Sequence, residues 1–183
     1  MQKEKTKSRW FRQAKKLCDF RSIEKKIKKA KKKHQGAKKT EINKLLSCAP
    51  NYIGCYAENE LENLIINSFP CFLIVNIDHS GLPGSHWISL HITQTKIEIW
   101  DSLGFRLLDW PRIPCFLLNF LHKLVVSRKI TVSKKMQGAT SVLCGYYCIF
   151  FIISRPFISF HELNNYFSSD LSSNDDRLIK FFS

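Results

Sequence analysis

The chain has 183 residues, of which 44% are hydrophobic and 13% aromatic, and its formal net charge is +14. This length and composition predict one domain with a hydrophobic core and exclude a wholly disordered chain. No segment reaches the roughly 20 apolar residues that span a bilayer, and the lysine-rich start lacks the apolar stretch of a secretory signal, so we expect a soluble intracellular protein without a membrane partner.

Seven cysteines are scattered along the sequence, an odd number that does not suggest a disulfide framework. No C-x-x-C pair is present to start a zinc site, and Cys144 and Cys148 are four residues apart in an apolar segment. We therefore expect reduced thiols and no bound metal.

The positive charge is concentrated at the start of the chain. Residues 1–44 hold 18 Lys+Arg and 4 Asp+Glu, whereas residues 45–183 hold 11 of each. This asymmetry divides the chain into a basic N-terminal arm over 1–44 and a neutral domain over 45–183.

Within the arm, only Ile23, Ile27 and Ala30 form an apolar stripe over residues 22–39, which favours a flexible segment over a packed helix. Dense lysines neutralise phosphates without reading base sequence, and basic runs also direct nuclear import, so both roles remain open. The expected nucleic-acid contacts are Lys25, Lys26, Lys28, Lys29, Lys31, Lys32 and Lys33.

The neutral domain alternates short helical and extended patterns, with no internal repeat. In chain order we expect a helix over 40–50, a helix over 57–69, a strand over 71–77, a loop over 78–85, a hairpin over 85–105, a helix over 115–126, a strand over 129–132, a buried helix over 141–154 and helices over 160–167 and in the closing segment. This order predicts an α+β fold in which a small mixed sheet packs against a central buried helix that carries Cys144.

The hairpin carries an ionisable residue at each end. His86 opens its first strand and Asp101 closes its second. Both side chains are expected at one edge of the sheet, where the carboxylate would hold Nδ1–H of the imidazole and leave Nε2 for a nucleophile. The remaining histidines lie in the arm, in a loop, in mid-strand or on helices, and surface or packing roles suit them better.

Cys144 lies just inside the start of the apolar helix, where the helix dipole favours a thiolate. Gly145 would allow a backbone to approach closely, and the Gln137 amide would donate a hydrogen bond to an oxyanion. Each residue also has an ordinary structural explanation. A buried core cysteine is the simpler interpretation of Cys144 alone, and Gln137 is otherwise a loop amide.

The ordered set H-W at 86–87, D-S-L-G-F at 101–105 and Q-x6-C-G at 137–145 resembles the adenovirus-type endopeptidases, the adenain family. These enzymes occur in double-stranded DNA viruses and Polinton/adintovirus-like elements and are related to SUMO and ubiquitin-like-protein cysteine proteases. The segments "LLSCAPNYIGCY" and "FLIVNIDHSGLPGSHW" extend the resemblance over residues 45–154.

The resemblance implies a cysteine endopeptidase with Cys144 as nucleophile, His86 as base, Asp101 as its orienting acid and Gln137 as oxyanion donor. Trp87 and Gly145 would shape a narrow substrate passage, with cleavage after Gly in Gly-Gly-like or Gly-x sites of virion precursor proteins. It further implies a virion and host-nucleus location, and we expect a monomer. Two alternatives stay open: a protease of host ubiquitin or SUMO-like conjugates, and a non-catalytic nucleic-acid-binding protein on the same fold.

The chain departs from that family in two respects. The segment "SRKITVSKK" has no cysteine and has Lys129 near the expected position, which argues against a disulfide-linked activating peptide. The basic arm is an addition to the family pattern. It suggests that double-stranded DNA activates the enzyme and that the arm of the same chain binds this DNA. The chemistry itself requires no cofactor.

Overall fold

The structure is a computed structural model that describes residues 11–104 and 114–183. It has an α+β fold, as the sequence predicts. Phe105, the last residue of the D-S-L-G-F motif, and the first ten residues of the basic arm lie outside the described part. Residues 11–17 are helical, and the elements that follow are α2 (Phe20–Lys33), α3 (Lys39–Leu45), β1 (Tyr52–Ala57), the 3-10 helix η1 (Glu58–Asn63), β2 (Cys71–Asn76), β3 (Trp87–Ile92), β4 (Lys96–Trp100), α4 (Cys115–Val125), β5 (Lys129–Val132), α5 (Cys144–Ser154), α6 (Phe160–Tyr166), the 3-10 helix η2 (Leu171–Ser173) and α7 (Asn174–Phe182).

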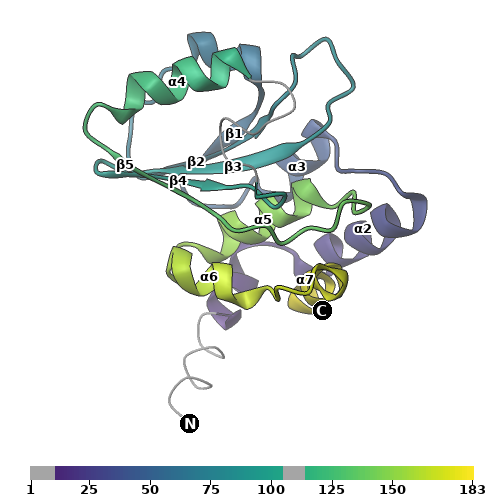
Figure 1. Cartoon of the computed structure of the whole chain (residues 1–183). Coiled ribbons are helices and arrows are strands. Elements are labelled where there is room, and N and C mark those ends of the chain that lie inside the picture. Colours follow the sequence, from purple (N-terminus) through teal and green to yellow (C-terminus); the bar gives the residue numbers. More distant parts are fainter. Residues whose placement is uncertain (1–10, 105–113) are drawn as a thin grey trace.

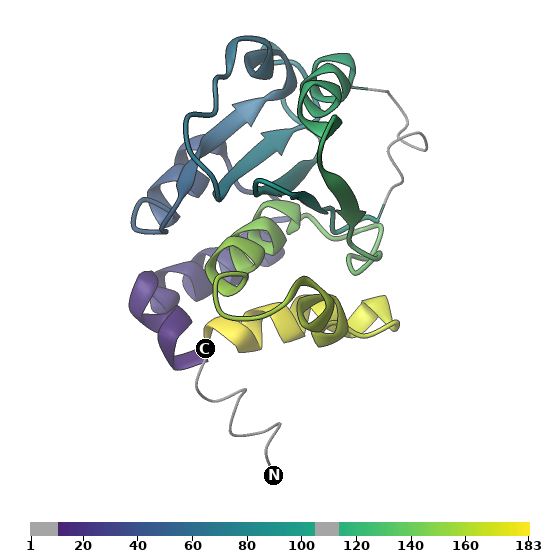
Figure 2. The ribbon, with the colours of Figure 1, turned by 90° about the vertical axis from the view of Figure 1, so that its left-hand side faces the viewer.

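The five strands form one mixed sheet in the order β1-β2-β3-β4-β5. The two outer pairs are parallel, and the inner strands β2, β3 and β4 are antiparallel. Helix α4 and η1 cover one face of the sheet, and α5 lies against the other (Figure 1). Beyond α5, a further layer contains α2, α6 and α7 (Figure 2).

Both faces of the sheet are buried because side chains alternate between two cores. All six residues of β2 are buried, as expected of a strand covered on both faces. Phe72 and Ile74 point into the core around α5, while Leu73 and Val75 point into the core under α4. The expected strand over 71–77 is confirmed.

Helix α5 is the central element of the larger core. All eleven of its residues are buried, so the helix has no solvent face. A helix that is apolar on every side must be surrounded by other elements, and here the sheet and the outer helices enclose it. This confirms the predicted buried helix and fixes Cys144 as its first residue.

The expectation of a flexible basic arm is wrong for residues 20–33, which form α2. Phe20 extends the stripe of Ile23, Ile27 and Ala30, and all four side chains are buried. They pack into the larger core together with residues of α7, where Phe20 contacts the rings of Phe181 and Phe182. The thin stripe suffices because each of its side chains is buried in the larger core.

Two other elements differ from the sequence prediction. The helix expected over 57–69 is replaced by the six-residue η1, in which the Glu60 carboxylate accepts from the backbone N–H of Ala57. Strand β1 was not predicted, since its Gly54 and short apolar run gave no clear alternation. It pairs with β2 at the edge of the sheet.

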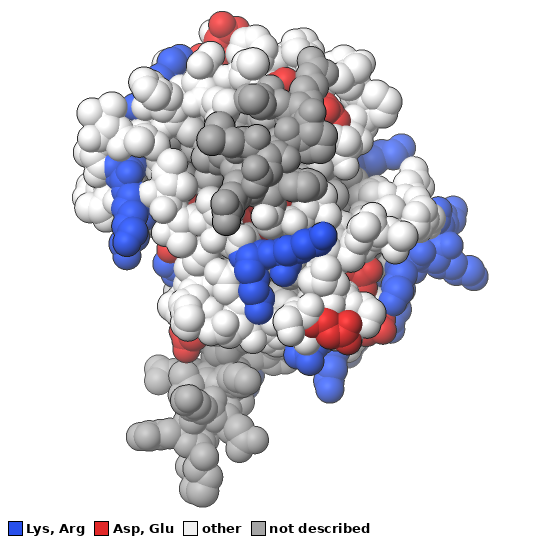
Figure 3. All heavy atoms as spheres, viewed as in Figure 1, with Lys and Arg blue, Asp and Glu red and all other residues white. Residues whose placement is uncertain are grey.

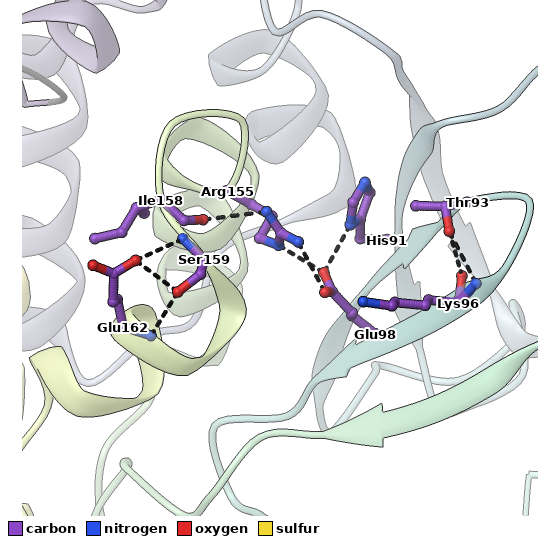
Figure 4. Close-up of polar contacts among 8 residues, drawn as sticks. All are labelled: His91, Thr93, Lys96, Glu98, Arg155, Ile158, Ser159 and Glu162. Carbon is purple, nitrogen blue, oxygen red and sulfur yellow. Dashed lines mark hydrogen bonds and ion pairs between the residues drawn. The ribbon is translucent and has the colours of Figure 1, made fainter.

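A buried ionic network links the sheet to the end of α5. Arg155 donates from Nε and Nη2 to the Glu98 carboxylate at 2.7 and 2.9 Å. His91 Nδ1 lies 2.8 Å from Oε2 of the same carboxylate, and its ring stacks on Phe72. Figure 4 shows Glu98 held between His91 on one side and Arg155 on the other. The network orients α5 relative to β3 and β4.

Candidate active site

His86 and Asp101 meet at one end of the β3–β4 pair. His86 directly precedes β3 and Asp101 directly follows β4, and Ser89 pairs with Trp100 in this antiparallel register. His86 Nε2 lies 2.7 Å from Asp101 Oδ1, and the two residues are 3% and 0% exposed. The expectation that the hairpin ends converge is therefore met.

Asp101 is held by its neighbours as well as by His86. The backbone N–H of Leu103 donates to Oδ1 at 2.9 Å, and Ser133 Oγ accepts from the backbone N–H of Asp101 at 2.8 Å. These bonds orient a carboxylate that is shielded from water, so its position relative to the imidazole is fixed before any substrate arrives.

Cys144 lines the same cavity as His86 and interacts with its imidazole ring. Burial alone lowers the pKa of His86, but hydrogen bonds to Asp101 and to the Cys144 thiol outweigh it and raise the pKa to about 9. The imidazole is thus stabilised as a cation near the thiol of Cys144, the first residue of α5.

The ring orientation is the reverse of the one expected. The nitrogen that meets Asp101 is Nε2, so Nδ1 is left for the sulfur. Nε2 is the ring nitrogen farther from the backbone, and His86 reaches Asp101 with this tip of the ring. His86 still pairs with Asp101, but through Nε2 rather than through Nδ1.

Gln137 lies in the same cavity and is held at both ends of its amide. Its Oε1 accepts from Ser102 Oγ at 2.5 Å, and its Nε2 donates to the Ser141 carbonyl at 2.6 Å. An amide nitrogen has two hydrogens, so one remains to serve an oxyanion. Ser102, next to Asp101 in the D-S-L-G sequence, was not singled out from the sequence.

The turn after β4 brings the acid and the amide together. The backbone N–H groups of Met136 and Gln137 both donate to the Ser102 carbonyl, at 2.9 and 2.8 Å. Gly104 has φ +67°, and a Cβ there would lie 2.4 Å from the Lys135 nitrogen. Only glycine permits this close approach, which explains the glycine in the motif.

A cavity of ≈ 730 Å³ opens over these side chains. His86, Gln137 and Cys144 line it, as does Trp87. Gly145 is not one of its lining residues: a Cβ there would lie 3.1–3.3 Å from Ala37, Ile42 and Trp87. The glycine therefore admits the chain's own side chains rather than a substrate strand.

The opposite wall of the cavity comes from residues 35–39, between α2 and α3. Trp87 Nε1 donates to the Ala37 carbonyl at 3.0 Å, which links this wall to the β3–β4 hairpin. Gly36 packs near the Val142 carbonyl, two residues before the thiol. This contribution was missed because the segment was assigned to the arm on charge alone.

The second thiol of α5 has a structural role in this arrangement. Cys148 is buried and donates from Sγ to the Trp87 carbonyl at 3.4 Å. Burial raises the pKa of Cys148 well above its usual range, which disfavours a thiolate. No group of three or more metal-ligating side chains occurs in residues 11–104 and 114–183. Over the same residues, no helix is long and apolar enough to cross a membrane.

The lysines of α2 are all exposed, and they gather on the side of the molecule where α2 lies (Figure 3). Three of them form ion pairs: Lys26 with Glu41, Lys28 with Glu24 and Lys31 with Asp176. The other four have no ion pair within the described residues: Lys25, Lys29, Lys32 and Lys33.

No protein-family model matches the sequence, and a search of characterised proteins finds no match. Among solved structures, the chain is similar to the ASFV pS273R protease, seen in the crystal structure of its selenomethionine form. The TM-score is 0.38 and the sequence identity 22%, and the match covers 62% of this chain and 43% of the protease chain. This chain therefore matches less than half the length of that protease.

Proposed function

We propose that this chain is a cysteine endopeptidase. The observation that carries the proposal is the buried His86 imidazole, which hydrogen-bonds Asp101, interacts with the Cys144 thiol and lines one cavity together with that thiol. A thiol paired with an imidazole whose orientation a third group fixes is the arrangement that nucleophilic catalysis requires.

The reaction follows from these positions. The Cys144 sulfur attacks the scissile carbonyl carbon, and the free hydrogen of Gln137 Nε2 and the Cys144 backbone N–H stabilise the oxyanion. The proton held on His86 Nδ1 passes to the leaving amine as the C–N bond breaks, which leaves a thioester on Cys144. Water then gives a proton to His86 and attacks the thioester, so that the carboxylic acid and the free thiol are regenerated.

The cleavage preference proposed is for Gly before the scissile bond, in Gly-Gly-like or Gly-x sites. The support is the sequence resemblance to adenain-type enzymes together with the place of Trp87, which lines the cavity and whose indole Nε1 donates to the Ala37 carbonyl. A side chain on the substrate would have to share this space, and glycine has none. We propose virion precursor proteins as substrates, in the virion and the host nucleus, on the sequence resemblance to adenain-type enzymes.

DNA assistance belongs to the same proposal, and the exposed lysines of α2 support it. Exposed lysines bind phosphates through counterion release, which weakens steeply as salt rises. Activation by duplex DNA is therefore expected to shrink at high salt.

The decisive experiment is cleavage of a fluorogenic peptide ending in Leu-x-Gly-Gly by the full chain. Cys144→Ala should abolish turnover. Cys115→Ala is the matched control, since it removes an exposed thiol from the first residue of another helix and should keep full activity. Equal turnover by the native chain and Cys144→Ala would refute the enzyme.

Parallel reactions separate the remaining substrates and roles. Faster cleavage of ubiquitin or SUMO-like conjugates than of free Gly-Gly peptides would move the proposal to a deconjugating protease. Tight DNA binding without turnover of any Gly-containing substrate would favour a non-catalytic nucleic-acid-binding protein.

A further inference from the structure

A second, smaller hollow of ≈ 140 Å³ lies beside the active-site cavity. Four lysines line it: Lys26, Lys29 and Lys33 of α2 and Lys38 in the following segment. The helical spacing explains the cluster, because side chains three and four residues apart share one face of a helix. The sequence showed a uniformly basic run, and only the fold separates these lysines from the rest.

The charges in this hollow are not balanced within the described residues that line it. Glu41 is the one carboxylate there, and Lys26 pairs with its Oε1 at 3.2 Å while the Tyr146 hydroxyl donates to the same oxygen at 3.3 Å. Lys29, Lys33 and Lys38 have no ion pair in the described part of the chain. Unpaired cations that line one hollow repel one another, and a bound anion relieves that repulsion.

The hollow shares a wall with the active site. Gln35, Gly36 and Lys38 line both the hollow and the larger cavity. Tyr146, at the hollow, lies on α5 two residues beyond Cys144. Residues 35–38 thus form a single segment between the lysine-lined hollow and the active-site cavity.

We infer that this hollow is a binding site for a compact anion that carries two or more phosphate groups, and that its occupancy immobilises the 35–38 wall of the active site. The small volume suits a short polyphosphate, and lysines bind phosphate as mobile point charges. The regulatory half of this inference rests on the proposed peptidase function, whereas the binding half does not. The inference also separates the lysines of α2 into two groups: Lys26, Lys29 and Lys33 line the hollow, whereas Lys25 and Lys32 do not.

Calorimetric titration of tripolyphosphate into the full-length Cys144→Ala chain tests the site at constant ionic strength. One-to-one binding is expected. The double variant Lys29→Ala/Lys33→Ala should weaken it about tenfold or more, because two charge-assisted contacts are lost. The matched control is Lys25→Ala/Lys32→Ala, which removes the same charge from the same helix and should change affinity by about twofold at most.

Equal losses in the two double variants would overturn the site, because they would show a diffuse electrostatic effect. Absence of tripolyphosphate binding would overturn the site too. If the chain then bound duplex DNA, and this binding required Lys29 and Lys33, the lysines would be assigned to nucleic acid instead. Circular dichroism of both double variants verifies that α2 is intact.

Hydrogen exchange of the backbone amides of 35–39 tests the coupling without any turnover. Tripolyphosphate should slow this exchange in Cys144→Ala and leave it unchanged when Lys29 and Lys33 are also replaced. In the active chain it should lower KM for the peptide about fivefold or more. A chain that binds tripolyphosphate and protects the wall but cleaves nothing would refute the proposed function alone. Binding with no change in exchange would refute the coupling.

Discussion

Both partners of the His86–Asp101 hydrogen bond are buried, and this burial determines how strongly the carboxylate acts on the pKa of His86. In a water-exposed pair the carboxylate would be screened, whereas here both groups are almost inaccessible. The pKa of His86, which burial lowers, is brought up to about 9 by Asp101 and the Cys144 thiol. At neutral pH the ring is therefore a cation that can stabilise a thiolate and hold the proton for the leaving amine.

Replacing Asp101 with Asn should move the alkaline limit of activity to lower pH. Activity falls as pH rises through the pKa of His86, and the native limit is expected near pH 9. Loss of the carboxylate removes one cause that raises this pKa, and kcat/KM should also drop about 10²-fold, at the low end for a proton-transfer group. Profiles of kcat/KM against pH measure both effects, with Asp78→Asn in the same cavity as control. An unchanged alkaline limb in Asp101→Asn would contradict the assigned role.

Gln137 offers a test that separates an oxyanion donor from a structural amide. Gln137→Ala should lower kcat by about 10²–10³-fold with little change in KM. Gln137→Glu keeps an oxygen for the Ser102 bond but replaces the donor with a charge that repels an oxyanion. Steady-state kinetics should show Glu at least as impaired as Ala. Recovery of activity in the Glu variant would mean that Gln137 only supports the loop.

At the scale of residues, the sequence predicted that His86 and Asp101 would meet, but it gave the wrong ring nitrogen for the contact. His86, Asp101 and Cys144 were identifiable because strand ends and a helix start are positions that a pattern can locate. Which ring nitrogen meets Asp101 depends on the path of the backbone before β3, which no pattern encodes. Gly145 was assigned to the substrate for the same reason, since its close neighbours Ala37 and Ile42 lie in a segment distant in sequence.

At the scale of elements, α2 shows how a helix gains stability from the rest of the fold. Its apolar stripe is narrow, and the helix propensity of its residues alone would not keep α2 folded in water. The partners that bury it include Phe181 and Phe182 at the far end of the sequence. A prediction from local pattern misses such partners, so it assigned α2 to a flexible arm. Strand β1 was missed in a similar way, because its pairing with β2 is not visible in its own residues.

Truncation of the α2 stripe should destabilise the whole domain. Ile27 is 0% exposed within the larger core, so Ile27→Ala should cost about 2–5 kcal/mol in the free energy of unfolding. Lys25→Ala on the exposed side of the same helix should change it by no more than about 0.5 kcal/mol. Urea denaturation followed by circular dichroism compares the two. If both variants unfold at the native midpoint, α2 is not part of the cooperative core.

At the scale of the whole molecule, the two halves of the active site come from different layers. The hairpin supplies His86 and Asp101 from the sheet, and α5 supplies Cys144 from the layer below. Their alignment depends on the contact between sheet and helix, which is apolar near the thiol and ionic at the other end, where Arg155 reaches Glu98. The sequence predicted a sheet packed against a buried helix that carries Cys144. It did not reveal the ion pair between Arg155 and Glu98, because these residues lie in segments that become neighbours only after folding.

The Glu98 network should make the fold sensitive to acid. Burial raises the pKa of Glu98, but hydrogen bonds from His91 and Arg155 outweigh it and lower the pKa to about 2. A carboxylate with a depressed pKa stabilises the fold fully above its ordinary value of 4.5, and this stabilisation is lost as pH falls toward 2. Glu98→Gln should therefore cost on the order of 3 kcal/mol at neutral pH. The deficit should shrink as pH falls and vanish near pH 2. Urea denaturation across this range measures it, with the exposed Glu62→Gln as control, and a deficit that stays constant with pH would show that Glu98 acts through packing rather than charge.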